Sequence, residues 1–232
     1  MSEQLDVVVI ISANAEWLAV KEVLPEITLR ASPFGEWFVY PSPESPVIFF
    51  HGGWGKISAA AAAQYIIDRW KPGLLINLGT CGGFSGFVEL GTVLLVDRTR
   101  VYDILEQMGD SEAALEYYST DLDLGWLPEP YPHPVQRAVL VSADRDLLTQ
   151  NIPHLHERYG AVAADWESGA IAWTATRNHV RCLILRAVSD LVGGTGGEAY
   201  GNLELYQART REIMEQLLEQ LPDWLSYIRA QI

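Results

Sequence analysis

Residues that commonly form disulfides or hold metals are scarce in this chain of 232 residues. Cysteine occurs only at Cys81 and Cys182, which is too few for a disulfide framework and favours a reducing compartment such as the cytoplasm. The 5 histidines are scattered, and neither His-x-x-x-His nor Cys-x-x-Cys spacing occurs. The sequence therefore predicts no metal site, and nothing in it indicates a cofactor.

Long apolar runs and positive charge are also in short supply. No run approaches the ~20 apolar residues that a membrane span needs, so we expect no membrane partner. The opening "MSEQLDVVVIISA" is acidic and lacks the basic region of a signal peptide, which again favours the cytoplasm. Lysine and arginine number 16 against 30 acidic residues, and the net charge of −14 repels a phosphate backbone. Nucleic acid is therefore excluded as an expected partner.

The remaining composition is that of an ordinary globular protein, 49% hydrophobic and 20% charged, in which strand and helix patterns alternate. Short apolar runs predict strands at 6–11, 36–40, 46–50, 74–79, 91–97, 138–142 and 180–188. Helical spacing predicts helices at 15–24, 55–70, 168–179 and 208–228. The alternation predicts an α/β fold with a largely parallel sheet and helices on both faces, in a single domain of residues 1–232.

The segment 104–134 departs from this alternation because it is acidic, aromatic and dotted with prolines. We expect it to leave the sheet as a lid or as a contact between subunits. A solvated surface loop fits the same composition equally well.

A glycine-rich stretch, "INLGTCGGFSG", follows the predicted strand 74–79. The carboxyl ends of strands form the edge at which open α/β sheets bind ligands, and glycines allow close approach of the backbone. Neither the P-loop pattern nor G-x-G-x-x-G is present. Thr80 and Gly82 are therefore candidate substrate-binding residues, although a tight turn without a ligand explains the stretch as well.

Three further stretches carry an acid where a strand ends or a helix begins. Glu16 opens the helix 15–24, and Asp165 and Glu167 precede the helix at 168–179. Asp190 follows the apolar run "CLILRAV", where the strand is expected to stop before a loop rich in glycine. Each acid taken alone is explained as a helix cap or turn residue. Their shared position predicts one site, in which Glu167 could accept hydrogen bonds from two neighbouring sugar hydroxyls.

Taken together, these stretches resemble the nucleoside phosphorylase and nucleosidase superfamily, especially the branch that hydrolyses 5′-methylthioadenosine and S-adenosylhomocysteine. The resemblance rests on "GWGKISAAAAAQYIIDRWKPGLLINLGTCGGF", "ADWESGAIA" and "LRAVSD", and it extends over most of the chain. It implies a three-layer α/β/α sandwich with a mixed, mostly parallel twisted sheet. It also implies cleavage of the N-glycosidic bond of a purine nucleoside, a small-molecule partner, and assembly as a homodimer.

The resemblance assigns catalytic roles to two acids. Asp190 matches the general acid that protonates purine N7, with Ser189 holding its carboxyl group. Glu16 matches the base that orients and deprotonates water, provided that the preceding loop is one residue shorter here. Without that gap, Trp17 falls at the position instead.

The remaining matches concern substrate binding. Glu167 matches the acid that binds the ribose hydroxyls and stabilises the cationic sugar. Trp166 stands where a methionine usually lies under the sugar. Leu147 belongs to an Arg-Asp-Leu segment at 145–147 that in the family packs on the base, usually with an aromatic residue. These departures leave the exact nucleoside open.

The choice of nucleophile also follows from the resemblance. Phosphorylases of this superfamily hold phosphate partly with an arginine shortly before the glycine turn, where this chain has Asn77. A buried phosphate without a fixed cation is unfavourable, so hydrolysis is favoured over phosphorolysis. A phosphate-dependent phosphorylase, a futalosine-type hydrolase and a nucleoside-binding protein without turnover remain alternatives.

Overall fold

The computed structural model describes residues 7–24, 26–42, 45–194 and 196–231. Asp6, the predicted start of the first strand, and Pro25, near which the first helix is expected to end, lie outside the described residues. The helices are α1 (Asn14–Val23), α2 (Gly55–Trp70), α3 (Ser111–Tyr117), the short 3-10 helix η1 (Thr149–Asn151), α4 (Ile152–Tyr159), α5 (Ser168–Arg177) and α6 (Leu203–Arg229). The strands are β1 (Val7–Ile11), β2 (Arg30–Ser32), β3 (Gly35–Tyr40), β4 (Val47–His51), β5 (Leu74–Phe84), β6 (Val93–Val101), β7 (Ser119–Asp121), β8 (Gln136–Ser142), β9 (Ala161–Asp165), β10 (Arg181–Gly193) and β11 (Gly196–Gly197).

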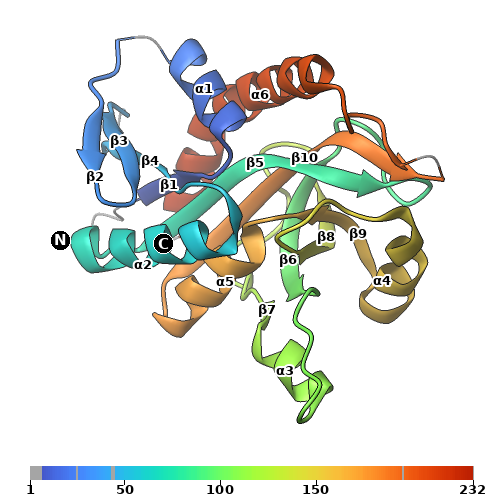
Figure 1. The fold of residues 1–232 in the computed structure, drawn as a ribbon. Coiled ribbons are helices and arrows are strands. Elements are labelled where there is room, and N and C mark those ends of the chain that lie inside the picture. Colours follow the sequence, from blue (N-terminus) through green and yellow to red (C-terminus); the bar gives the residue numbers. More distant parts are fainter. Residues whose placement is uncertain (1–6, 25, 43–44, 195, 232) are drawn as a thin grey trace.

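The sheet lies between two helical layers, with α1 and α6 on one face and α2 and α5 on the other (Figure 1). Strand β1 shows why its sequence suits this position. Val7, Val9 and Ile11 pack into the core beneath α6, whereas Val8 and Ile10 pack into the core beneath α2. Since successive strand residues point to opposite faces, a strand covered on both sides requires an uninterrupted apolar run. The predicted three-layer α/β/α fold is confirmed.

The sheet is mixed, and its longest ladders are parallel. β1 pairs in parallel with β4 and β5, and β5 pairs in parallel with β10. Parallel ladders join β6 to β8 and β8 to β9, while antiparallel ladders join β10 to β6 and β5 to β9. The strands β5, β10, β6, β8 and β9 thereby form a closed ring of pairings, and β4, β3 and β2 extend the sheet beyond β1. This closure brings the ends of β5, β9 and β10 together.

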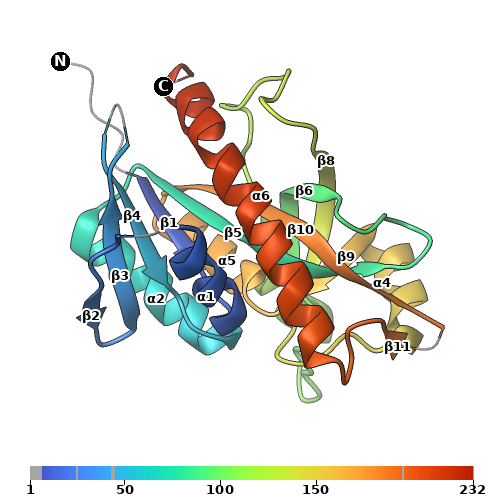
Figure 2. The same ribbon diagram turned by 90° about the horizontal axis from the view of Figure 1, so that it is seen from above.

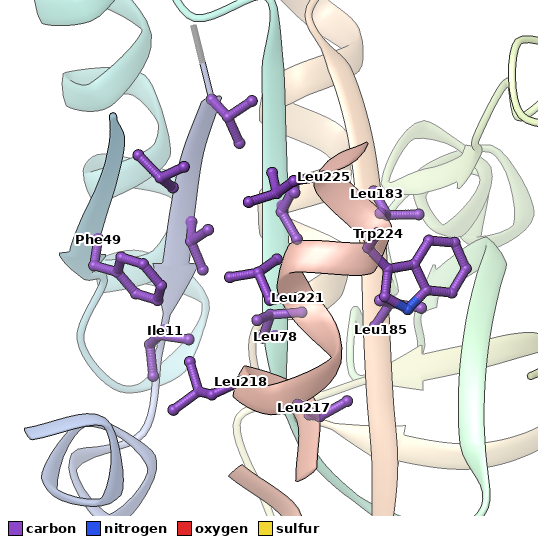
Figure 3. Packing of buried hydrophobic residues seen from close by; sticks show 14 of the residues in the cluster. Ile11, Phe49, Leu78, Leu183, Leu185, Leu217, Leu218, Leu221, Trp224 and Leu225 are labelled. Carbon is purple, nitrogen blue, oxygen red and sulfur yellow. The ribbon is translucent and has the colours of Figure 1, made fainter. Parts of the chain in front are cut away.

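Helix α6 runs diagonally across β5 and β10 (Figure 2). Leu217, Leu221 and Trp224 on its apolar stripe are at most 5% exposed and pack against the sheet (Figure 3). Met214 is fully buried in the same cluster. The helix begins earlier than the predicted residue 208, because the Asn202 side chain accepts a hydrogen bond from the Leu205 N–H and caps an earlier turn. Within the described residues, no helix is both long and apolar enough to cross a membrane.

Two strands extend further than the sequence predicts. β5 continues through the glycine-rich stretch to Phe84, and β10 continues past Asp190 to Gly193. Gly82 pairs with Asp190 on one side and with Ala164 on the other. The expectation that both strands end before these residues is wrong, because pairing with neighbouring strands holds the glycines extended despite their low strand propensity.

The segment 104–134 leaves the sheet after β6. Its helix α3 projects away from the body of the protein and buries none of its residues (Figure 1). The chain then returns through β7, which pairs with β6, and buries Leu124 and Leu127 in the core beneath α6. None of its described residues lines the cavity described below.

Candidate active site

A cavity of about 710 Å³ opens where β5, β9 and β10 end. Every site residue predicted from the sequence lines it: Glu16, Thr80, Gly82, Leu147, Trp166, Glu167, Ser189 and Asp190. The same cavity is lined by Trp54 and by the chain that connects β11 to α6. The four separate stretches of sequence therefore meet at one place.

Asp190 reaches the cavity through a β-bulge. The register of β10 against β5 shifts between Val188 and Asp190, which leaves Ser189 as the extra residue. Bulges of this kind redirect the side chain that follows and are common beside active sites. The Ser189 hydroxyl lies 3.2 Å from Asp190 Oδ1 and 3.3 Å from the Cys81 carbonyl oxygen, and it can donate to either.

The second carboxyl oxygen of Asp190, Oδ2, differs from the first in its hydrogen bonding. The residue is only 7% exposed, and its Oδ2 is buried and accepts no well-formed hydrogen bond from the described residues. Burial raises the pKa of Asp190, against the opposing effect of the Ser189 hydroxyl. A carboxyl group in this position retains a proton above the usual aspartate range and has one oxygen available to a ligand.

Glu16 lies in the first turn of α1 and is 1% exposed. Its Oε2 accepts a hydrogen bond from the Ala13 N–H at 3.1 Å, which is the helix-start role expected from its position. Its Oε1 accepts from the Thr80 N–H at 2.6 Å and lies 3.0 Å from the Thr80 hydroxyl. Trp17, the alternative residue, instead stacks on His51 and does not line the cavity. Glu16 therefore lines the cavity and Trp17 does not, while the catalytic role of Glu16 stays a prediction.

Arg186 is the main site residue that the sequence reasoning missed. It is fully buried in β10, and its guanidinium lies 3.3 Å from Glu16, 3.0 Å from Asp165 and 3.8 Å from Glu167. Burial alone would lower the pKa of Arg186, but the three acids raise it above its ordinary value. The available signal was a lone arginine within the apolar run "CLILRAV", since a buried charge requires partners.

Asp165 and Glu167 differ in role although they lie two residues apart. Asp165 accepts hydrogen bonds from the Ser168 N–H and the Ser142 hydroxyl, so it caps α5 and holds β8. Glu167 makes no capping bond and, among the described residues, accepts a hydrogen bond from the Gly55 N–H at 3.0 Å alone. Burial, together with the nearby Asp165, raises the pKa of Glu167 to about 8. Glu167 is therefore a buried acid facing the cavity.

The site contains more acid than base. Glu16, Asp165 and Glu167 surround Arg186, whose N–H groups also donate to Ser168, Asn77 and the Thr80 carbonyl oxygen. One guanidinium cannot neutralise three carboxylates, so this region either holds an extra proton or attracts positive charge.

Gly79 provides the room for this cluster. A β-carbon at Gly79 would lie 2.1 Å from Arg186 Nη1 and 2.5 Å from Glu16 Oε1. At Gly82, by contrast, a β-carbon would meet nothing closer than 3.5 Å. The glycine that the site cannot replace is therefore Gly79, which the sequence reasoning did not single out.

Aromatic side chains form another part of the cavity wall. The rings of Trp54 and Trp166 stack with centroids 5.1 Å apart, and Trp54 is 62% exposed. Leu147 is buried, and its carbonyl accepts a hydrogen bond from the Tyr200 hydroxyl at 2.9 Å. Trp54 was not predicted because it precedes α2 in a stretch that lacks any charge pattern. Among the described residues, no group of three or more histidine, cysteine or acidic side chains could hold a metal ion.

The fold defines a three-layer α/β/α protein with a buried acidic cavity at the strand ends, and a family model identifies the group. Residues 8–220 match the model described as the phosphorylase superfamily, and the chain belongs to this family. It is 28% identical over 180 residues to a 5′-methylthioadenosine/S-adenosylhomocysteine nucleosidase of Maridesulfovibrio salexigens, covering 72% of this chain and 78% of that protein. A protein of the same name from Thermotoga maritima is 26% identical over 176 residues, covering 75% and 79%.

Solved structures show the same fold. A Helicobacter pylori MTAN mutant with 5′-methylthioadenosine in its active site superimposes with a TM-score of 0.77 at 12% identity, covering 94% of this chain and 98% of that one. The corresponding nucleosidase of S. pneumoniae, with a transition-state inhibitor, gives a TM-score of 0.74 at 15% identity, covering 96% and 99%. At these identities the likeness establishes the fold.

Proposed function

We propose that this protein hydrolyses the N-glycosidic bond of a purine nucleoside of the 5′-methylthioadenosine or S-adenosylhomocysteine type. Adenine and a ribose derivative are the products. The observation that carries the proposal is the buried carboxyl group of Asp190, whose Oδ2 accepts no well-formed hydrogen bond from the described residues and which shares one cavity with Glu16 and Glu167. The names of the curated relatives support the choice of substrate.

Asp190 is the proposed general acid. Its raised pKa favours a protonated carboxyl group, which can donate hydrogen to N7 as the bond to the sugar breaks. The base then leaves as a neutral molecule instead of an anion. Proton transfer of this kind contributes about 10²–10⁴ in rate. The β-bulge at Ser189 and burial of the carboxyl group supply the orientation and environment that this role requires.

Glu167 and the acid cluster are proposed to stabilise the sugar. As the base departs, positive charge develops on the ribose, and the excess of carboxylates around Arg186 favours that charge. A developing cation also favours the ionised form of Glu167 and so lowers its pKa. The Gly55 N–H fixes one oxygen of Glu167, which leaves the other able to accept from a ribose hydroxyl.

Glu16 is proposed to orient water and accept its proton. Thr80, Arg186 and the Ala13 N–H hold its carboxylate from several directions, so its position is fixed within the cavity wall. Water suits this site better than phosphate as the nucleophile. Arg145 is the one lysine or arginine among the described cavity-lining residues, and its guanidinium lies over the Tyr102 ring. A phosphate dianion would therefore lack a dedicated cation.

The test is adenine release from 5′-methylthioadenosine, S-adenosylhomocysteine, adenosine and inosine, each with and without phosphate. We expect release of adenine in phosphate-free buffer and no stimulation by phosphate. Strict dependence on phosphate would show a phosphorylase instead. Tight binding of adenine without cleavage of any nucleoside would show a binding protein.

We also propose that the chain forms a single domain that works as a homodimer in the cytoplasm. The segment 104–134 supports a subunit contact, because Leu105 and Met108 are 80% and 97% exposed and none of the segment's described residues lines the cavity. Ile57, at the start of α2, is 85% exposed as well. Both cysteines are free, which fits a reducing compartment. Sedimentation of a monomer at all protein concentrations would contradict the dimer.

A further inference from the structure

An ion pair outside the cavity is connected to Asp190 through the backbone. Arg209, on α6, donates to Glu198 Oε2 at 2.7 Å and to the Ser189 carbonyl oxygen at 3.2 Å. Ser189 is the extra residue of the bulge, and its carbonyl belongs to the peptide that leads into Asp190. Arg209 therefore holds the peptide group that sets the direction of the Asp190 side chain.

Glu198 immediately precedes a stretch of chain that lines the cavity. Its N–H donates to the Leu191 carbonyl at 3.1 Å, one residue beyond Asp190 on β10. The chain that follows, residues 199–203, lines the cavity. The Tyr200 hydroxyl ties this chain to the opposite wall at Leu147. One ion pair thus joins α6, the bulge at Ser189 and the chain at 199–203 that lines the cavity.

The two members of the pair act on Asp190 with opposite sign. The positive charge of Arg209 lowers the pKa of Asp190, whereas the negative charge of Glu198 raises it. The other titratable groups facing Asp190 are Cys81 on β5 and Tyr200, both of whose pKa values are raised first by burial. Neither carries charge at neutral pH, so Arg209 and Glu198 are the charges that balance one another beside the acid.

We propose that Arg209 and Glu198 are positioning residues that form a charge-balanced clamp on Asp190. Arg209 anchors the bulge that aims the acid, and Glu198 neutralises Arg209 so that the anchor does not draw the proton off the acid. This inference rests on the proposed function, because it assigns the clamp to the acid of that reaction. It adds to the proposed site two residues that do not belong to the cluster of acids around Arg186.

The test compares Arg209→Gln, Glu198→Gln and the double variant in pH profiles of kcat/KM with 5′-methylthioadenosine. Activity requires protonated Asp190, so it falls as pH rises through the pKa of that group. Without Glu198, the unpaired arginine lowers this pKa, and the descending limb moves to lower pH. Without Arg209, the limb moves to higher pH. We expect each limb to shift by about half a pH unit or more, because Arg209 contacts the peptide that precedes Asp190 while both side chains of the pair are partly exposed to solvent.

Matched controls separate the clamp from general effects of removing a surface ion pair. Arg211 and Glu22 form a comparable pair between α6 and α1, 3.4 Å apart. Arg211→Gln and Glu22→Gln should leave the descending limb where it is. In the double variant Arg209→Gln/Glu198→Gln, the descending limb should lie near its wild-type pH. In Arg209→Lys, which keeps the charge, the limb should also lie near its wild-type pH, but kcat should be lower.

Shifts of both single variants in the same direction, or no shift in either, would overturn the clamp. The carboxyl carbon of Asp190 can also be titrated by NMR, which requires no turnover. If wild-type protein cleaves no purine nucleoside, the proposed function fails, and this titration still tests the clamp by the direction of each shift. If Arg209→Gln does not fold, Glu198→Gln and Arg209→Lys still decide the question, since the side chain of Glu198 is 46% exposed and its replacement leaves the core intact.

Discussion

Adding a single methyl group at Gly79 should dismantle the charge cluster beneath the cavity. A β-carbon there would lie 2.1 Å from Arg186 Nη1 and 2.5 Å from Glu16 Oε1, far inside van der Waals contact. Arg186 cannot swing aside freely, because Ser168 and Asn77 also hold its guanidinium. Gly79→Ala must therefore separate Arg186 from Glu16 or shift β5.

The stability lost in Gly79→Ala can be estimated from two known effects. Overpacking a well-filled core costs about 1–3 kcal/mol, and depriving a buried charge of its partner costs about 3–5 kcal/mol. Arg186 retains Asp165 as a partner, so we expect a loss of about 2–5 kcal/mol in the free energy of unfolding. For a domain of this size, this corresponds to a fall in Tm of roughly 4–20 °C.

The assay is urea denaturation of Gly79→Ala beside Gly82→Ala, a control on the same strand. At Gly82 the nearest atom to a new β-carbon is Val192 Cγ2 at 3.5 Å, which is an ordinary contact. Its stability should remain within about 1 kcal/mol of wild type. Equal losses for the two variants, or no loss for Gly79→Ala, would refute the spatial argument.

Three other predictions concern the two buried acids Asp190 and Glu167 and the core residue Leu221. Because the pKa of Asp190 is raised, kcat/KM should fall with rising pH only above the ordinary aspartate range of about 4, and a limb at or below 4 would contradict burial as the cause. The pKa of Glu167 in the folded protein is raised from 4.5 to about 8, so between these pH values the folded state keeps a proton that the unfolded chain has released. The free energy of unfolding should therefore fall as pH rises from 4.5 to about 8. Glu167→Gln should flatten that slope, as measured by urea midpoints across pH; an unchanged slope would assign it to other groups. Leu221→Ala, on the buried face of α6, should cost about 2–5 kcal/mol in the same denaturation experiment. Leu90→Ala, which is 46% exposed and lies outside the proposed subunit contact, should cost less than about 1 kcal/mol.

Patterns within a single element were readable from the sequence. The apolar run of β1 and the helical stripe of α6 report burial directly, because each depends on the geometry of one segment. Glu16 and Glu167 were found because they stand at helix starts, and Asp190 was found at an expected strand end although β10 continues past it to Gly193. The structure brings them into one cavity, and their catalytic roles remain proposals.

Features that depend on contacts between distant segments were not readable. The bulge at Ser189 arises from register between β10 and β5, and no local signal marks it. Gly79 is required by the space that Arg186 occupies from another strand, and its own backbone conformation gives no sign of this. The proposed clamp of Arg209 and Glu198 likewise joins α6 to a bulge in β10.

The most direct test of the central claim is adenine release by wild-type protein and by Asp190→Asn, side by side in phosphate-free buffer. Asparagine is nearly isosteric but cannot donate the proton that the leaving base needs. We expect turnover of 5′-methylthioadenosine by the wild type and a loss of at least ~10²-fold in kcat for the variant. Undiminished release of adenine by Asp190→Asn would contradict the account.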